Sequence, residues 1–153
     1  MRQLYSVAPL SDDEVAPAFA IVLALYPGID LDTWSAFART LIHANATEAR
    51  AIVGMRTGDG YLCGLFAYRV DTDFEYRSAL VVDPIAVLDL IEPKPAMRAM
   101  IDAIESTAKR LGCGRTCIHV RGTHASLGSR LARLGYAPEA QILSKVFAMP
   151  GPI

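Results

Sequence analysis

Three strand-like segments follow one another without an intervening helix, and they constrain the fold more than any other feature. They are ARAIVGMRT (49–57), YLCGLFAYRV (61–70) and ALVVDPIAVLDLI (79–91). The first two are joined by Gly58-Asp59-Gly60, which supplies the positive φ angles that a hairpin turn requires. The middle of the chain therefore predicts consecutive sheet strands, with Pro84 marking a bulge or a break in the third.

Helical patterns flank these strands. Ser11 followed by three acidic residues is typical of a helix start, and Asp30 or Asp32 begins a second helix. Apolar residues at helical spacing between 96 and 111 predict a third helix that ends at Gly112. The other expected elements are strands at 3–10, 115–120 and 140–149 and a helix at 123–136. The order β-α-α-β-β-β-α-β-α-β indicates an α/β (α+β) fold with a mixed, mostly antiparallel sheet flanked by helices.

Composition narrows the class of protein. With 153 residues, of which 52% are hydrophobic, the chain is expected to form a single domain over 1–153 with a sizeable core. A net charge of −1 argues against nucleic-acid binding through bulk electrostatics. No apolar run approaches the ~18 residues of a membrane span, and the N-terminus lacks a signal-peptide pattern. Three cysteines, an odd number, argue against a disulfide framework. We therefore expect a cytoplasmic protein without a membrane partner.

The element order resembles the GNAT superfamily of acyl-CoA N-acyltransferases over nearly the whole chain. LYPGIDLDTW (25–34) is similar to the turn between the first two helices, which borders the acceptor site in that family. ALVVDPIAV (79–87) is similar to the fourth strand, whose bulge offers backbone groups to pantetheine. ESTAKRLGCGRTCIHV (105–120) resembles the central helix and fifth strand, and LARLGY (131–136) the end of the fourth helix. The resemblance implies transfer of an acyl group from acetyl-CoA to an amine acceptor. No metal is expected, because CGRTC (113–117) has one pair of thiols without a matching second pair.

The cofactor motif of the family differs here. Its Arg or Gln, its Gly and its final Gly or Ala correspond to Glu92, Pro95 and Met97. Small residues in such a loop let several backbone N–H groups approach a pyrophosphate. Pro93 and Pro95 have no N–H, and Glu92 adds a negative charge. These replacements are expected to weaken anion binding.

The resemblance nevertheless assigns cofactor contacts to five residues. Backbone groups around Ile85 and Val87 would hold pantetheine, and the side chains of Lys94 and Arg98 would replace the glycine nest next to Met97. A tyrosine that protonates the departing thiolate in many family members corresponds to Leu131, which cannot donate a proton.

Candidate chemistry outside the cofactor motif is limited. Asp83 and Asp89 could accept the proton of an amine, although turn or strand-end solvation is the simpler interpretation. Cys117 and His119 share one face of a strand, so a cysteine nucleophile with His119 as its base is one interpretation, while core packing is the alternative. Tyr26 is a candidate pocket residue. Helical spacing favours core packing for Trp34 and Phe37 instead.

Two hypotheses follow from the sequence. In the first, the protein is an N-acetyltransferase that binds acetyl-CoA. In the second, it is a degenerate GNAT-fold module that binds a ligand or oligomerises without acetyl-CoA chemistry. Exposed strand edges and the apolar ending VFAMPGPI favour a homodimer in either case.

Overall fold

The computed structural model describes residues 4–44, 49–88, 93–121 and 125–148. Within the chain there are two compact units, Met1–His119 and Val120–Ile153. The two units are described in turn. The assignment of the whole chain to a single domain stays a prediction.

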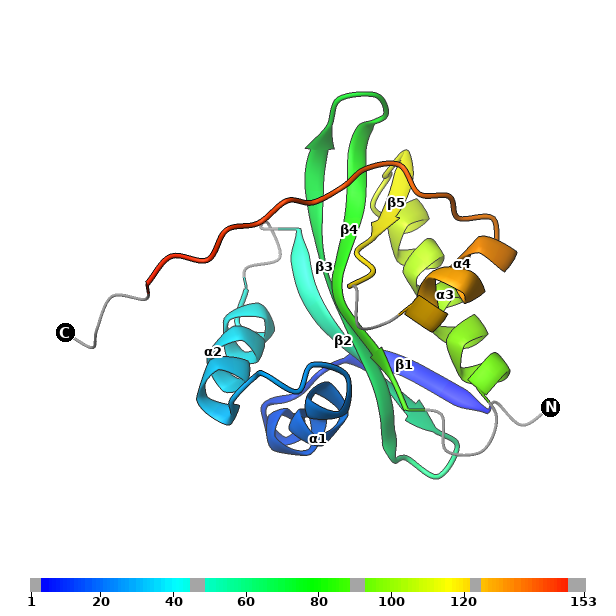
Figure 1. Cartoon of the computed structure of the whole chain (residues 1–153). Coiled ribbons are helices and arrows are strands. Elements are labelled where there is room, and N and C mark those ends of the chain that lie inside the picture. The colour runs from blue at the N-terminus through cyan, green and yellow to red at the C-terminus, as the bar shows by residue number, and fades with distance from the viewer. Residues whose placement is uncertain (1–3, 45–48, 89–92, 122–124, 149–153) are drawn as a thin grey trace. The chain divides into compact units, whose positions relative to one another are not determined.

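The first unit is built on a five-stranded sheet (Figure 1). The strands lie side by side in chain order: β1 (Tyr5–Pro9), β2 (Arg50–Thr57), β3 (Leu62–Asp73), β4 (Arg77–Val87) and β5 (Arg115–Ile118). The first four pair antiparallel, as the short connections predict, and β5 pairs parallel with β4. The predicted fold class, a mixed and mostly antiparallel sheet flanked by helices, is confirmed.

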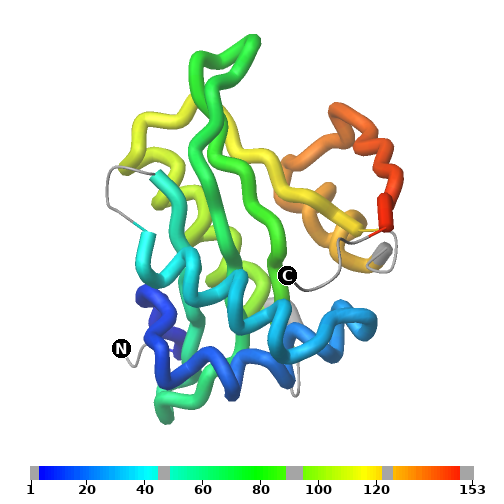
Figure 2. Tube along the Cα trace, turned by 90° about the vertical axis from the view of Figure 1, so that its left-hand side faces the viewer, coloured from blue at the N-terminus to red at the C-terminus, as the bar shows by residue number. Residues whose placement is uncertain are grey.

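Helices cover both faces of this sheet, as Figures 1 and 2 show. One side carries α1 (Val15–Leu25), preceded by the short 3-10 helix η1 (Asp12–Glu14), and α2 (Leu31–Ile42). The other side carries α3 (Pro93–Arg110). A parallel connection between β4 and β5 requires a crossover of this kind, and α3 provides it.

Both N-terminal helix starts use the residues that the sequence indicates. Asp30 Oδ1 accepts a hydrogen bond from the Thr33 N–H at 2.7 Å, and this bond lowers the pKa of Asp30. At the earlier start, the Glu14 carboxylate accepts the Ser11 N–H at 3.1 Å and pairs with the Arg56 guanidinium. The bond from Arg56 is the main cause of the lowered pKa of Glu14. This pair ties the start of α1 to β2.

One core lies between α1, α2 and the sheet. Its centre is Trp34, which is fully buried and donates a hydrogen bond from Nε1 to the Val15 carbonyl at 2.8 Å. The buried residues of this core are Leu10, Val15, Ala18, Ile21, Val22, Trp34, Ala38, Ile52, Leu65, Ala67 and Ala86. Core packing of Trp34 is confirmed. The same prediction for Phe37 is wrong, because that side chain is 39% exposed at the helix surface, with its ring centroid 6.1 Å from that of Trp34.

A second core lies between α3 and the opposite face of the sheet. The apolar side of the helix is buried as its spacing predicts, through Met97, Met100, Ile101, Ile104 and Ala108. The helix approaches β3 closely at Gly64, where an added Cβ would lie 2.8 Å from Met100 Cε and 2.9 Å from the Ala86 carbonyl oxygen. Glycine at position 64 is what permits this contact.

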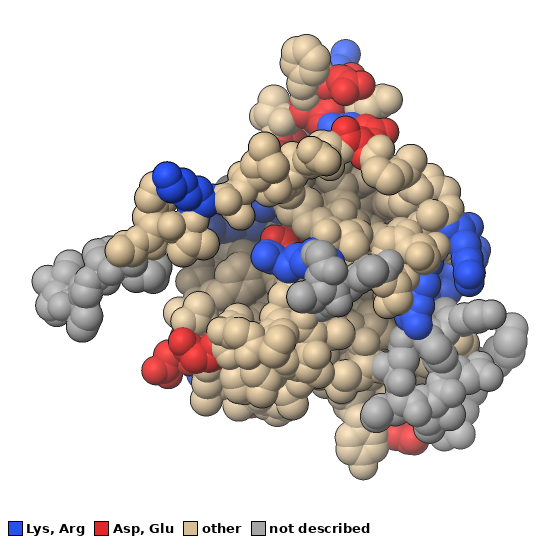
Figure 3. Space-filling view, viewed as in Figure 1, with Lys and Arg blue, Asp and Glu red and all other residues tan. Residues whose placement is uncertain are grey.

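The tip of the β3–β4 hairpin fixes the start of β5. Asp73 accepts the N–H groups of Glu75 and Tyr76 and binds Arg115 of β5 at 2.9 Å. Burial works to raise the pKa of Asp73, but the N–H groups of Tyr76 and Glu75 and the Arg115 guanidinium together hold it below its usual value. Figure 3 shows acidic and basic residues gathered at this hairpin. Because the contact anchors Arg115, it sets the position of β5 beside β4.

The second unit contains α4 (Ala125–Arg133). The chain leaves this helix through Gly135, whose φ is +94°, and the Tyr136 N–H donates to the Leu131 carbonyl. The helix end at LARLGY is therefore as predicted. The predicted last strand is wrong over 140–148, which form neither helix nor strand, and Met149 lies outside the described residues. A strand needs hydrogen bonds from a neighbouring strand, and apolar alternation alone cannot supply them.

Candidate active site

The candidate site lies where β4 and β5 stop pairing. Their parallel register runs from Ala79 opposite Arg115 to Val82 opposite Ile118, and the last hydrogen bond joins the His119 N–H to the Val82 carbonyl at 3.0 Å. Strand β4 continues to Val87, whereas β5 ends at Ile118. In the described part of the chain no strand pairs with this side of β4 after Val82.

A bulge at Asp83-Pro84 accompanies this separation. The register between β3 and β4 shifts there, from Tyr68 opposite Val82 to Phe66 opposite Ile85. The predicted bulge at Pro84 is therefore confirmed. Pro84 has no N–H to give to a ladder, so the irregularity falls where a regular strand would lose a hydrogen bond.

The bulge directs backbone groups of Ile85 and Val87 away from β3. The Leu88 N–H donates to the Cys63 carbonyl on β3 at 2.8 Å, and the direction of backbone groups alternates along an antiparallel strand. Ala86 therefore faces β3 like Leu88, whereas the N–H and C=O groups of Ile85 and Val87 face the side on which β5 has ended. This edge can hydrogen-bond an extended ligand that carries amides.

Tyr26 lies against this edge from the end of α1. Its hydroxyl donates to the Ile85 carbonyl at 3.2 Å and accepts the Ile85 N–H at 3.4 Å. Tyr26 is half-buried and follows the last residue of α1. The sequence predicts Tyr26 as a pocket residue. In the structure its hydroxyl lies at the bulge of β4.

Asp83 and His119 are brought together from two strands. Val82 and Ile118 are register partners, so the residues that follow them are neighbours, and Asp83 Oδ2 lies 3.6 Å from His119 Nδ1. The side chains are 19% and 27% exposed, respectively. The separation is longer than a hydrogen bond, but it places a carboxylate beside Nδ1, where the orienting group of a general base lies.

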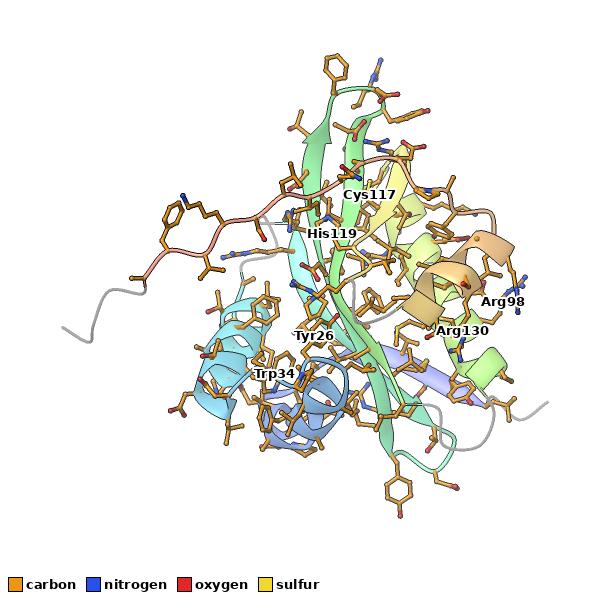
Figure 4. All side chains as sticks on the ribbon, viewed as in Figure 1. Tyr26, Trp34, Arg98, Cys117, His119 and Arg130 are labelled. Carbon is orange, nitrogen blue, oxygen red and sulfur yellow. The ribbon has the colours of Figure 1, made fainter. Side chains whose placement is uncertain are left out.

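Cys117 lies on β5 and precedes His119, which follows the end of that strand, by two residues, so alternation places both on the same side. Figure 4 shows Cys117, His119 and Tyr26 following one another beside β4 and β5. None of the three cysteines, all of which are described, forms a disulfide. The acidic neighbour of His119 is Asp83, a pairing that sequence analysis did not anticipate, although it named both residues as catalytic candidates.

The start of α3 carries residues that correspond to the cofactor motif of the family. Residues 89–92, which include Asp89 and Glu92, lie outside the described residues, and so does the side chain of Lys94. Met97 is 7% exposed and packs in the core. The Arg98 side chain is 67% exposed, with its Nε 3.7 Å from Asp102, so it faces solvent near the helix start. Cofactor roles for Met97 and Arg98 stay predictions.

Two other features are absent from the described residues, a metal site and a membrane-spanning helix. These residues contain no cluster of His, Cys, Asp or Glu that could hold a metal ion. None of their helices is long and apolar enough to cross a membrane. Leu131 lies in α4 as the resemblance implies.

Comparison with solved structures decides the fold. An aminoglycoside 6'-N-acetyltransferase from Acinetobacter baumannii aligns with 95% of this chain and 99% of its own, at 14% identity and a TM-score of 0.72. The chain has the GNAT fold. AAC(6')-Iy in complex with a bisubstrate analogue, CoA-S-monomethyl-acetylneamine, aligns over 96% of this chain and 100% of its own, with 13% identity and a TM-score of 0.77. Glucosamine-6-phosphate N-acetyltransferase from Arabidopsis thaliana aligns over 95% and 100%, with 10% identity and a TM-score of 0.70.

Sequence comparisons add no closer relative to this GNAT-fold chain. No protein-family description matches it, and no curated protein matches it by sequence. At sequence identities of 10–14%, the solved structures establish the fold of this chain and nothing more. Conclusions about activity must therefore come from the residues of this chain.

Proposed function

We propose that this protein is an N-acetyltransferase that moves an acetyl group from acetyl-CoA to an amine. The observation that carries the proposal is the edge of β4 after Val82, where the backbone groups of Ile85 and Val87 face away from β3. Pantetheine is an extended chain with two amides, and it can pair with such an edge as an added strand does. Solved structures of the same fold include one bound to a CoA bisubstrate analogue.

The second requirement is an acceptor for the proton of the amine. In the proposed reaction the neutral amine attacks the thioester carbon, and the C–N bond forms before the C–S bond breaks. His119 takes the amine proton on Nε2, while Asp83, 3.6 Å from Nδ1, holds the ring in position. The imidazolium then returns the proton to the departing thiolate. The products are an amide and coenzyme A, and no other reactant is needed.

The phosphates of the donor would have fewer contacts than in a glycine-rich loop. Pro93 and Pro95 lie in the first turn of α3, so only Lys94 and Ala96 among residues 93–96 carry a backbone N–H. Arg98 is exposed one turn from the helix start and can add a charged contact. We expect binding through pantetheine to dominate and phosphate contacts to add little.

The same two prolines favour a second candidate function. If the loss of N–H donors at α3 prevents acetyl-CoA from binding, the β4 edge is left for another extended ligand, and the protein acts as a binding or oligomerising module. A homodimer and a cytoplasmic location stay predictions under both functions.

Isothermal titration calorimetry with acetyl-CoA tests the proposal. We expect a dissociation constant of about 10–100 μM, because one backbone edge contributes without a full phosphate nest. Pro95→Ala should tighten binding severalfold, since it returns an N–H donor to the first turn of α3. The matched control is Pro138→Ala, a proline replacement in the second unit, which should leave the dissociation constant unchanged.

Failure of the protein to bind acetyl-CoA would contradict the proposal. An absence of heat at several temperatures, together with no change in melting temperature at millimolar acetyl-CoA, would mean that this fold does not bind the donor here. The second candidate function would then replace the first.

A further inference from the structure

We propose that Tyr26 is a catalytic residue, and that its hydroxyl and the Ile85 N–H together form the oxyanion-binding site for the thioester carbonyl. This inference rests on the proposed function, because it needs acetyl-CoA at the β4 edge. It adds a residue from the turn between α1 and α2 to a site otherwise built from β4 and β5. In the complex the Ile85 N–H binds the thioester carbonyl, and pantetheine pairs with the backbone groups of Val87.

The Tyr26 hydroxyl forms hydrogen bonds with both backbone groups of Ile85. The hydroxyl donates to the Ile85 carbonyl at 3.2 Å and accepts the Ile85 N–H at 3.4 Å. Both distances lie at or beyond the long end of the usual range, so the two bonds are weak. A ligand oxygen with greater negative charge can therefore replace the present acceptors and bind both donors, the Tyr26 hydroxyl and the Ile85 N–H.

One ligand oxygen can accept hydrogen bonds from both the Ile85 N–H and the Tyr26 hydroxyl. The Ile85 N–H points at the Tyr26 oxygen, 3.4 Å away, so the tyrosine side chain moves aside and a ligand oxygen takes its place about 2.9 Å from the Ile85 nitrogen, with no change in the backbone. The hydroxyl rotates its hydrogen from the Ile85 carbonyl to the incoming oxygen. A phenol and a backbone amide are then directed at the same point.

The position of this point matters for the chemistry. Ile85 follows the bulge by one residue, and Asp83, which pairs with His119, precedes it by two. A thioester whose carbonyl oxygen accepts from Ile85 therefore has its carbon beside the stretch of β4 that carries Asp83, the partner of the proposed base His119. When the amine attacks, negative charge develops on that oxygen, and two fixed donors stabilise it. Tyr26 keeps its proton throughout and serves as a hydrogen-bond donor.

The hydroxyl could instead be an obstruction that the donor must displace. The two roles predict opposite effects of removing it. If Tyr26 only blocks the edge, Tyr26→Phe frees the Ile85 N–H and tightens donor binding without slowing transfer. If Tyr26 is an oxyanion donor, the same replacement slows transfer.

The test combines kinetics with a spectroscopic measurement on Tyr26→Phe. We expect kcat to fall about 100-fold, as for loss of one oxyanion donor, while the dissociation constant for acetyl-CoA changes less than threefold. In isotope-edited infrared spectra of bound acetyl-CoA labelled at the carbonyl carbon, the C=O stretch should lie at higher frequency in Tyr26→Phe than in wild type, because one hydrogen bond is lost. Tyr61→Phe is the matched control, since Tyr61 is 73% exposed in the β2–β3 turn.

The outcomes separate the two proposals. If acetyl-CoA does not bind to the wild type, the proposed function fails and the Tyr26 inference fails with it. If acetyl-CoA binds and the C=O frequency and kcat are the same in wild type and Tyr26→Phe, only the Tyr26 inference is overturned. Tighter binding by Tyr26→Phe with unchanged kcat would also overturn it, in favour of the obstruction.

Discussion

Replacing His119 with alanine is expected to lower kcat for acetyl transfer by about 100- to 1,000-fold, because a general base at this position removes the amine proton as the C–N bond forms. The binding of acetyl-CoA should change little, since in the proposed complex the β4 edge and not the imidazole holds the donor. Steady-state kinetics with a reactive primary amine, together with calorimetry of donor binding, measure the two effects separately.

Two further variants make this prediction specific. Asp83→Asn keeps the size of the side chain that lies 3.6 Å from His119 but removes its charge, and we expect a loss of about 10-fold. Cys117→Ala alters the same side of β5 and should leave kcat within twofold. A loss in Cys117→Ala as large as in His119→Ala would contradict the assignment of the base and favour a cysteine nucleophile.

Replacing Trp34 with alanine is expected to destabilise the protein by about 3–5 kcal/mol, because this side chain fills the centre of the α1–α2 core. The indole is fully buried, and its Nε1 bond to the Val15 carbonyl joins the two helices. Chemical denaturation followed by circular dichroism measures the change in the free energy of unfolding.

Two further variants, at Trp34 and at nearby Phe37, separate the contributions of the Nε1 hydrogen bond and of packing to this loss of stability. Trp34→Phe keeps an aromatic ring but leaves the Val15 carbonyl without this donor, and should cost about 1–3 kcal/mol. Phe37→Ala, at a position that is 39% exposed, should cost less than Trp34→Ala. Equal losses in Phe37→Ala and Trp34→Ala would contradict the placement of the core.

The sequence predicts most of the fold because local signals and long-range packing agree. Local sequence is enough to determine several features. These are the turn at Gly58-Asp59-Gly60, the N-cap at Asp30 and the apolar side of α3. The strand predicted at 140–149 rests on apolar alternation alone. Strand formation depends on a pairing partner that is distant in sequence, so this pattern could not decide it.

The candidate site shows the same division between local and distant information. Pro84 marks the bulge in the sequence, and Asp83, His119 and Tyr26 were each candidates for separate reasons. Their grouping could not be predicted, because it follows from the register of β4 with β5 and from a hydrogen bond between residues 26 and 85. The resemblance predicts a cofactor contact for Met97, and this role stays a prediction for a side chain that is 7% exposed in the structure.

The most direct test of the central claim is a measurement of backbone amide signals by ¹⁵N NMR during titration with acetyl-CoA. If the donor lies along β4, the largest shifts should occur at Ile85 and Val87, with smaller shifts at His119 and little change in β1 or β2. Saturable shifts confined to other residues, with Ile85 and Val87 unchanged, would show that the edge of β4 is not the donor site and would contradict the proposed function.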